Sequence, residues 1–223
     1  ELISAPCRRK RKRALDGLSL RIESGERVAI VGPNGAGKTT LARILCGVVS
    51  PEMGSARVAG IDVAAGPAVR RLVGFARPDD PALHPRLDAI ECLSFHAALH
   101  GVEGASIERA LSAIAGAGEL ANRRVQSLSA GERAKISLAK ALIPRPRLLV
   151  LDELSRVLDP GAAAQVRRVL ADFAREGRAV LVITHDLSEA ALCDRVIVVR
   201  GGRNEADGPW SEVEIAAREV FGI

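Results

Sequence analysis

The chain has 223 residues, of which 48% are hydrophobic and 26% are charged, and its formal net charge is +5. This balance is typical of a globular domain, and it excludes a disordered, collagen-like, heptad-repeat or disulfide-rich protein. Tyr is absent and Phe occurs only four times, so aliphatic side chains must form the core.

The amino-terminal segment, residues 1–13, contains the basic run from Arg8 to Arg13. Such a run is either a solvated tail or a contact for anionic lipid headgroups or nucleic acid. No aromatic residues lie between the charges, so we expect no specific nucleic-acid partner. We expect no signal peptide, because no apolar segment of suitable length follows the basic amino terminus, and no apolar stretch of the given sequence reaches the roughly 18 residues that span a bilayer. We therefore expect a cytosolic chain that reaches a membrane only through a partner.

Short apolar runs predict the strands. Residues 18–22 alternate and stop at a Ser-Gly turn, and residues 27–31 lead into a glycine-rich loop. A Gly-Gly pair predicts a hairpin that ends with residues 203–206. Three further runs are continuously apolar, as expected of strands buried on both faces of a parallel sheet; they are residues 148–151, 179–183 and 196–199.

Segments with helical spacing alternate with these runs, at residues 41–46, 134–142 and 162–175. Strand and helix in alternation indicate the α/β class. The part of the chain around residues 81–130 differs, because it holds two helical patterns, 90–100 and 107–115, and no convincing strand. We expect a helical subdomain inserted into a single domain that covers residues 14–223, preceded by a basic tail.

The strongest motif is GPNGAGKTT, residues 32–40, which fits G-x-x-x-x-G-K-[ST] directly after an apolar run. Its glycines allow the backbone to wrap around phosphates, and the helix that follows adds its positive end. Lys38 places a charge on the outer phosphates, and Thr39 offers a hydroxyl to Mg²⁺. The predicted nucleotide-binding residues are Gly32, Pro33, Asn34, Gly35, Ala36, Gly37, Lys38, Thr39 and Thr40.

A second motif, LLVLDE at residues 148–153, is an apolar run that ends in two acids. Together with the phosphate loop, it indicates a nucleotide-hydrolysing site. Asp152 is expected in the Mg²⁺ shell, and Glu153 is expected to polarise the attacking water.

With these motifs and LSAGE at residues 128–132, residues 14–213 resemble the nucleotide-binding subunit of an ATP-binding cassette (ABC) transporter. LSAGE is similar to the family signature LSGGQ. The resemblance implies a P-loop NTPase core with a mainly parallel sheet, an antiparallel β subdomain and an inserted α-helical subdomain. It also implies that four signature residues, Ser129, Ala130, Gly131 and Glu132, face the γ-phosphate of ATP held by the opposite subunit.

Two more segments resemble parts of that family. SRVLD, residues 155–159, is similar to the D-loop, which implies that Asp159 lies at the dimer seam. His185 is similar to the switch histidine, which implies that it reaches the γ-phosphate and holds the attacking water together with Glu153. The other histidines, His84, His96 and His100, are interpreted as surface or packing residues.

The chain also departs from the family pattern. The usual glutamine after the core is missing from residues 74–87, and Asp79 or Asp80 occupies its place. A carboxylate can ligate Mg²⁺ but cannot donate a hydrogen bond as an amide does, so Asp79 is our candidate ligand and Asp80 the alternative. The aromatic residue that stacks on adenine is missing too; Lys12 or Arg13 falls near its place, and the guanidinium of Arg13 could stack on the base.

The resemblance implies an ATPase that uses ATP and Mg²⁺, with Lys38, Glu153 and His185 as catalytic residues. It implies a dimer of ABC subunits, identical or different, attached to an integral membrane permease on the inner face of the cell membrane. The acidic pair resembles that of antibiotic and multidrug exporters. Leu83, Leu87 and Leu93 are candidates for the groove that docks the permease. One alternative is a soluble ABC ATPase that acts on nucleic acid or in cofactor assembly. The other is a degenerate cassette that binds ATP without hydrolysing it.

Overall fold

The computed structural model describes residues 13–223, so the predicted basic tail lies almost entirely outside the described residues. The main sheet has six strands in the order β4-β5-β6-β1-β7-β8. Its strands are β1 Arg27–Val31, β4 Val73–Ala76, β5 Leu148–Asp152, β6 Ala179–Ile183, β7 Arg195–Arg200 and β8 Arg203–Gly208. Neighbouring strands pair in parallel except for the antiparallel β7–β8 hairpin. A separate antiparallel pair is formed by β2 Arg57–Val58 and β3 Ile61–Asp62.

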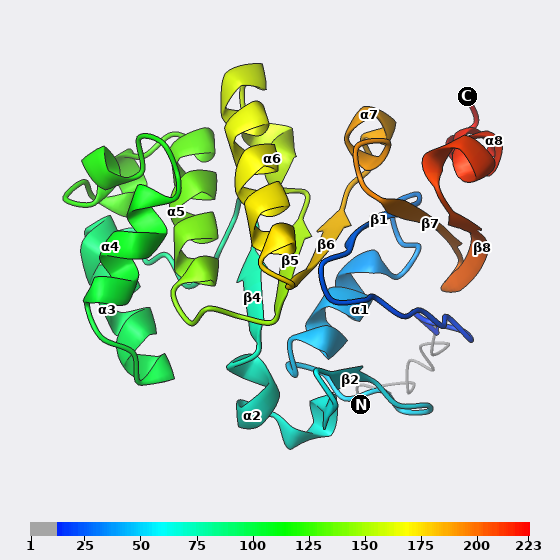
Figure 1. Ribbon diagram of the computed structural model, residues 1–223, viewed down its shortest axis with the longest axis horizontal. Helices are drawn as coiled ribbons and strands as arrows, with labels where there is room; N and C mark the ends of the chain where they lie inside the picture. Colours follow the sequence, from blue (N-terminus) through cyan, green and yellow to red (C-terminus); the bar gives the residue numbers. More distant parts are fainter. Residues whose placement is uncertain (1–12) are drawn as a thin grey trace, which may run out of the picture.

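The α-helices are α1 Lys38–Leu45, α2 Pro67–Arg70, α3 Ala89–His100, α4 Ala105–Ser112, α5 Ala130–Leu142, α6 Pro160–Arg175, α7 Leu187–Ala190 and α8 Trp210–Phe221. Helices cover both faces of the sheet (Figure 1). Val150 of β5 packs in the cluster that contains α1, whereas its neighbours Leu149 and Leu151 pack in the cluster that contains α5 and α6. This alternation explains why β5 is continuously apolar.

The predicted α/β fold is confirmed, with four of the expected strands, the hairpin and the alternating helices in place. Helices α3 and α4 enter the chain between β4 and β5 and pack on α5. In Figure 1 these helices form a lobe at one end of the sheet, with α5 between α4 and β4. Within residues 13–223, no helix is both long enough and apolar enough to cross a bilayer.

The predicted strand at residues 18–22 is wrong, because this segment pairs with no strand of residues 13–223. Its alternating apolar side chains do pack against the cluster around α1, which accounts for the pattern. Side chains, instead of the backbone of a neighbouring strand, donate hydrogen bonds to carbonyl groups of this segment. Asn204 Nδ2 donates to the carbonyl of Ser19 at 2.7 Å, and Arg195 Nη2 donates to the carbonyl of Arg21 at 2.8 Å.

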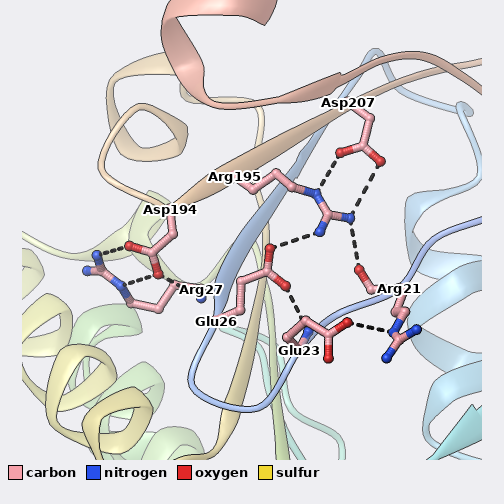
Figure 2. A network of polar contacts seen from close by, with 7 residues as sticks. All are labelled: Arg21, Glu23, Glu26, Arg27, Asp194, Arg195 and Asp207. Atoms are coloured by element: carbon pink, nitrogen blue, oxygen red, sulfur yellow. Dashed lines mark hydrogen bonds and ion pairs between the residues drawn. The ribbon is translucent and has the colours of Figure 1, made fainter.

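A polar network fixes this segment beside β7 and β8 (Figure 2). Arg195 pairs with Asp207 at 2.6 Å and with Glu26 at 2.8 Å, and Arg27 pairs with Asp194 at 2.6 Å. Bidentate guanidinium–carboxylate pairs of this kind are geometrically specific. The network therefore sets the position at which the chain enters β1, and with it the position of the loop that follows β1.

Candidate functional site

The phosphate loop joins β1 to α1, and one of its glycines is required by the fold. Gly37 has φ +105°, and a Cβ atom at this position would lie 2.4 Å from the carbonyl oxygen of Ala14. Gly37 is also the N-cap of α1, where no side chain caps the helix. The first backbone N–H groups of α1 are therefore available to an anion, as at other phosphate-binding helix termini.

Lys38 lies inside this loop, with only 7% of its surface exposed. Its Nζ donates hydrogen bonds to the carbonyl oxygens of Gly32, at 2.5 Å, and Pro33, at 3.2 Å. Burial lowers the pKa of Lys38, and the negative charges of Glu153 and Asp152 oppose that effect. The ammonium group is thus held where a phosphate on the loop would meet it.

Thr39 and Asp152 bring α1 to the end of β5. Thr39 Oγ1 donates to Asp152 Oδ2 at 3.4 Å, and Asp152 is 8% exposed. Burial raises the pKa of Asp152; the positive charge of Arg77 is the strongest opposing influence.

These two oxygen ligands fit Mg²⁺, which commonly takes one or two protein ligands together with phosphate oxygens and water. Residues 13–223 contain no group of three or more His, Cys, Asp or Glu side chains that could hold a metal on its own. A magnesium ion at Asp152 would therefore depend on the phosphates of a nucleotide.

Glu153 and His185 lie side by side, although they follow different strands. His185 Nδ1 is 3.3 Å from Glu153 Oε1. Glu153 has φ +53°, a conformation that is uncommon for a residue other than glycine, and its N–H donates to the carbonyl of Ile183 at 2.8 Å. The sequence predicted both residues, and the structure brings them together with His185 half-exposed to an incoming ligand.

The signature residues form the start of α5. Ser129 Oγ accepts from the N–H of Glu132 at 3.2 Å, and Glu132 Oε2 accepts from the N–H of Ser129 at 2.7 Å. This is a capping box, and the N–H of Ser129 together with Arg123 lowers the pKa of Glu132. Glu132 in place of glutamine thus stabilises the helix terminus. Among the described residues, no hydrogen bond joins these residues to the phosphate loop of the same chain.

The segment predicted to be a D-loop packs beside the signature. A Cβ atom on Gly131 would lie 3.0 Å from the carbonyl oxygen of Val157. Asp159 caps α6, because its Oδ1 accepts from the N–H of Ala162 at 2.8 Å. Sequence reasoning missed one contact here: Ser155 Oγ donates to Glu189 Oε2 at 2.7 Å, which joins this segment to α7.

The two acids of the loop after β4 have different environments. Asp80 is buried, accepts a hydrogen bond from Ser137 Oγ at 2.7 Å and forms an ion pair with Lys140. Asp79 is exposed. Asp80 therefore holds the loop on α5, because its carboxylate is bound by Ser137 and Lys140, and Asp79 remains our candidate metal ligand.

Asp80→Ala should lower the free energy of unfolding by about 3–5 kcal/mol, because it leaves Lys140 charged and unpaired in the interior. Asp79→Ala is the matched control and should change stability by less than about 0.5 kcal/mol. Urea denaturation of the two variants measures the difference. Equal effects would contradict the assignment of Asp80 to the interior.

The segment before β1 lies directly on the phosphate loop. The carbonyl of Ala14 is near Gly37, and a Cβ atom on Gly202 of the β7–β8 turn would lie 2.8 Å from the same oxygen. Arg13, the predicted adenine platform, is mostly exposed and pairs with Asp16 at 3.2 Å. It stands on the rim of a wide groove lined by the segment before β1, α1 and residues 49–60, which lies beside the phosphate loop.

The remaining histidines lie on α3 or in the loop that precedes it. The rings of His96 and His100 on α3 contact each other in a tilted arrangement with centroids 4.5 Å apart, and burial lowers the pKa of His96 to about 4. His84 is exposed. These positions agree with their interpretation as packing and surface residues.

Comparison with known proteins gives consistent results. The family model "ABC transporter" matches residues 15–156. Nod factor export ATP-binding protein I of Rhizobium etli is 35% identical over 218 residues, which are 95% of this chain and 69% of that protein. Fe(3+) ions import ATP-binding protein FbpC 1 of Rhodococcus jostii is 39% identical over 204 residues, which are 89% of this chain and 59% of that protein.

Among solved structures, a similar one is the dimeric post-hydrolysis state of the ATP-binding cassette MJ0796 bound to ADP and Pi. It has a TM-score of 0.78 and 25% sequence identity, and the match covers 88% of this chain and 90% of that one. The fold is therefore the ABC ATPase fold. Because the family model spans both the phosphate loop and the acids that end β5, the chain belongs to the ABC transporter family, as an ATP-binding subunit whose ATPase activity is coupled to transport.

Proposed function

We propose that this chain pairs head to tail with a second ABC subunit, identical or different, and that two ATP molecules are bound at the seam. The observation that carries this proposal is the position of the signature. Ser129 is exposed at the start of α5, on the same side of the molecule as the carboxyl ends of the strands (Figure 1). Among residues 13–223, no hydrogen bond joins it to its own phosphate loop, which supports a second subunit as the source of the signature that faces Lys38.

In the proposed mechanism, Lys38 and the N–H groups at the start of α1 hold the phosphates. Mg²⁺, held by Thr39 and Asp152, would neutralise phosphate charge. Glu153 accepts a proton from the attacking water, and His185 beside it keeps that water in line with the γ-phosphate. Water adds to the γ-phosphorus and ADP leaves, which removes the phosphate that joined the subunits. The signature amides and Asp159 face that phosphate from the opposite subunit.

The apolar surface of α3 supports a membrane partner. Phe95 is 65% exposed and Leu99 is 63% exposed. They are four residues apart and so lie on one face of the helix. Exposed apolar patches of this kind mark interaction sites. Of the leucines that the sequence suggested for this groove, only Leu87 is exposed.

Leu83 and Leu93 are core residues, buried against α5. The expectation that these two leucines line the dock is therefore wrong, because side chains buried in the core cannot contact a partner.

We propose export as the direction of transport and the inner face of the cell membrane as the location. The similarity to a Nod factor export protein and the exposed Asp79 support export. The direction of transport is a proposal, because the chain is also similar to an iron import protein. The family match favours a transport role over a soluble, non-transport ATPase.

Phe95→Glu and Leu99→Glu should each abolish transport and leave the basal ATPase rate of the purified chain unchanged. A charge on this face removes the apolar contact but lies outside the nucleotide site. Ile215→Glu is the matched control, because Ile215 is also exposed, at 74%, and lies on α8. Vesicles that contain the membrane subunit give the readout.

In the same vesicles, the wild-type protein should move cargo from the nucleotide side to the opposite side. Movement of cargo toward the nucleotide side would contradict export.

A further inference from the structure

Arg77 is the first residue after β4, and the register of the sheet places it beside the catalytic acids. Ala76 is the parallel partner of Leu151, so the next residues along the two strands are Arg77 and Asp152. Both lie at the carboxyl edge of the sheet, where the ligands of such sheets bind. The N–H of Arg77 donates to Ser137 Oγ at 3.1 Å, which fixes the start of the loop on α5.

The side chain of Arg77 is half-buried, and none of the ion pairs formed within residues 13–223 includes it. Its charge nevertheless acts on the site. Arg77 lowers the pKa of Asp152 more than Lys38 does, although Lys38 belongs to the phosphate loop. The register therefore places Arg77 next to Asp152, and no carboxylate of the described residues lies within ion-pair distance of its guanidinium.

Such a cation has a clear electrostatic use in this place. Asp152 and Glu153 are adjacent carboxylates, and the terminal phosphate of a nucleotide adds further negative charge beside them. Lys38 is bonded to two carbonyl oxygens of its own loop. A guanidinium presents several N–H donors in one plane and can bind two phosphate oxygens at once.

We propose that Arg77 binds the terminal phosphate of ATP, and thereby distinguishes ATP from ADP; this inference rests on the nucleotide site of the proposed function. Neither Asp79 nor Asp80 can do this, because carboxylates repel a phosphate. Hydrogen bonds connect Arg77 to α5, because Ser137 Oγ on α5 accepts from the backbone N–H of Arg77 and donates to Asp80. Occupancy of the terminal phosphate site is thus linked to α5, which begins at the signature.

The test is equilibrium binding of ATP and of ADP to the purified full chain, first in EDTA and then with Mg²⁺. In EDTA, Arg77→Gln should weaken ATP binding by about tenfold or more, the usual effect of losing a hydrogen bond to a charged group. ADP binding should not change. Arg77→Lys, which keeps the charge but not the planar fork, should give an intermediate affinity for ATP. Mg²⁺ should reduce the difference between Arg77→Gln and the wild type.

Arg109→Gln is the control, because it removes one positive charge from an exposed position on α4, beyond α5 from the sheet (Figure 1). Wild-type affinity of Arg77→Gln for ATP in EDTA would overturn the inference, and so would an equal loss of ATP and ADP binding. Wild-type protein that binds neither nucleotide would instead overturn the proposed nucleotide site itself. Arg77→Lys keeps the test decisive if circular dichroism shows that Arg77→Gln does not fold.

Discussion

Lys38→Ala should abolish ATP binding and lower the ATPase rate by about a hundredfold or more. Lys38 is the only ammonium group that the phosphate loop contains, and it is already held on the carbonyl oxygens of Gly32 and Pro33. Without Lys38, the loop keeps its backbone amides but has no positively charged side chain to attract the negative outer phosphates. Calorimetric titration with ATP and a phosphate-release assay measure the two effects.

Arg43→Ala is the control for this variant, because Arg43 is an exposed basic residue on the same helix. A second measurement uses the seam between subunits. Ser129→Arg should also be inactive, since it places a bulky cation at the signature. In an equal mixture with Lys38→Ala, half of the dimers hold one intact site, so about a quarter of the wild-type rate should return. No recovery would argue against a site shared between two copies.

Glu153→Gln should keep ATP binding and slow hydrolysis by about a hundredfold or more, because the amide cannot accept the proton of the attacking water. The substitution keeps the shape of the side chain and an oxygen that faces His185, 3.3 Å away in the native chain. Unhydrolysed ATP should then hold two subunits together. Phosphate release gives the rate, and light scattering after size exclusion with ATP gives the mass.

Glu205→Gln, on the exposed face of β8, provides a neutral-for-acid control that should behave as wild type. A Glu153→Gln variant that remains monomeric with ATP bound would contradict ATP-driven pairing. A variant that hydrolyses ATP at the native rate would show that another group accepts the proton.

The loop between β1 and α1 and the acids at the end of β5 could be located from the sequence because these segments are encoded locally. A glycine-rich loop between a strand and a helix leaves little choice of geometry, and Asp152 and Glu153 follow directly on the four apolar residues of β5. The pairing of Glu153 with His185 followed from resemblance. In the structure, Glu153 comes directly after β5, His185 is the second residue after β6, and the two strands are neighbours in the sheet.

Other features could not be predicted because they depend on residues far apart in the sequence. The alternation of residues 18–22 indicates a buried face, but the absence of a strand partner appears only once Asn204 and Arg195 occupy the carbonyls. Asp80 and Lys140 are 60 residues apart. Helix α3 carries apolar residues on every side, so its sequence does not indicate that Leu93 is buried and Phe95 exposed.

The contact of Ala14 with both Gly37 and Gly202 has a consequence for how this protein can vary. Two segments near the beginning of the sequence and one near its end share one small space, and two of the three lack side chains there. A methyl group added at Gly202 would push residues 14–16, which precede β1, toward the first turn of α1. Substitutions in the β7–β8 hairpin can thus change the affinity for nucleotide, although the hairpin takes no part in the chemistry. A change in one of the three segments therefore requires a compensating change in the others.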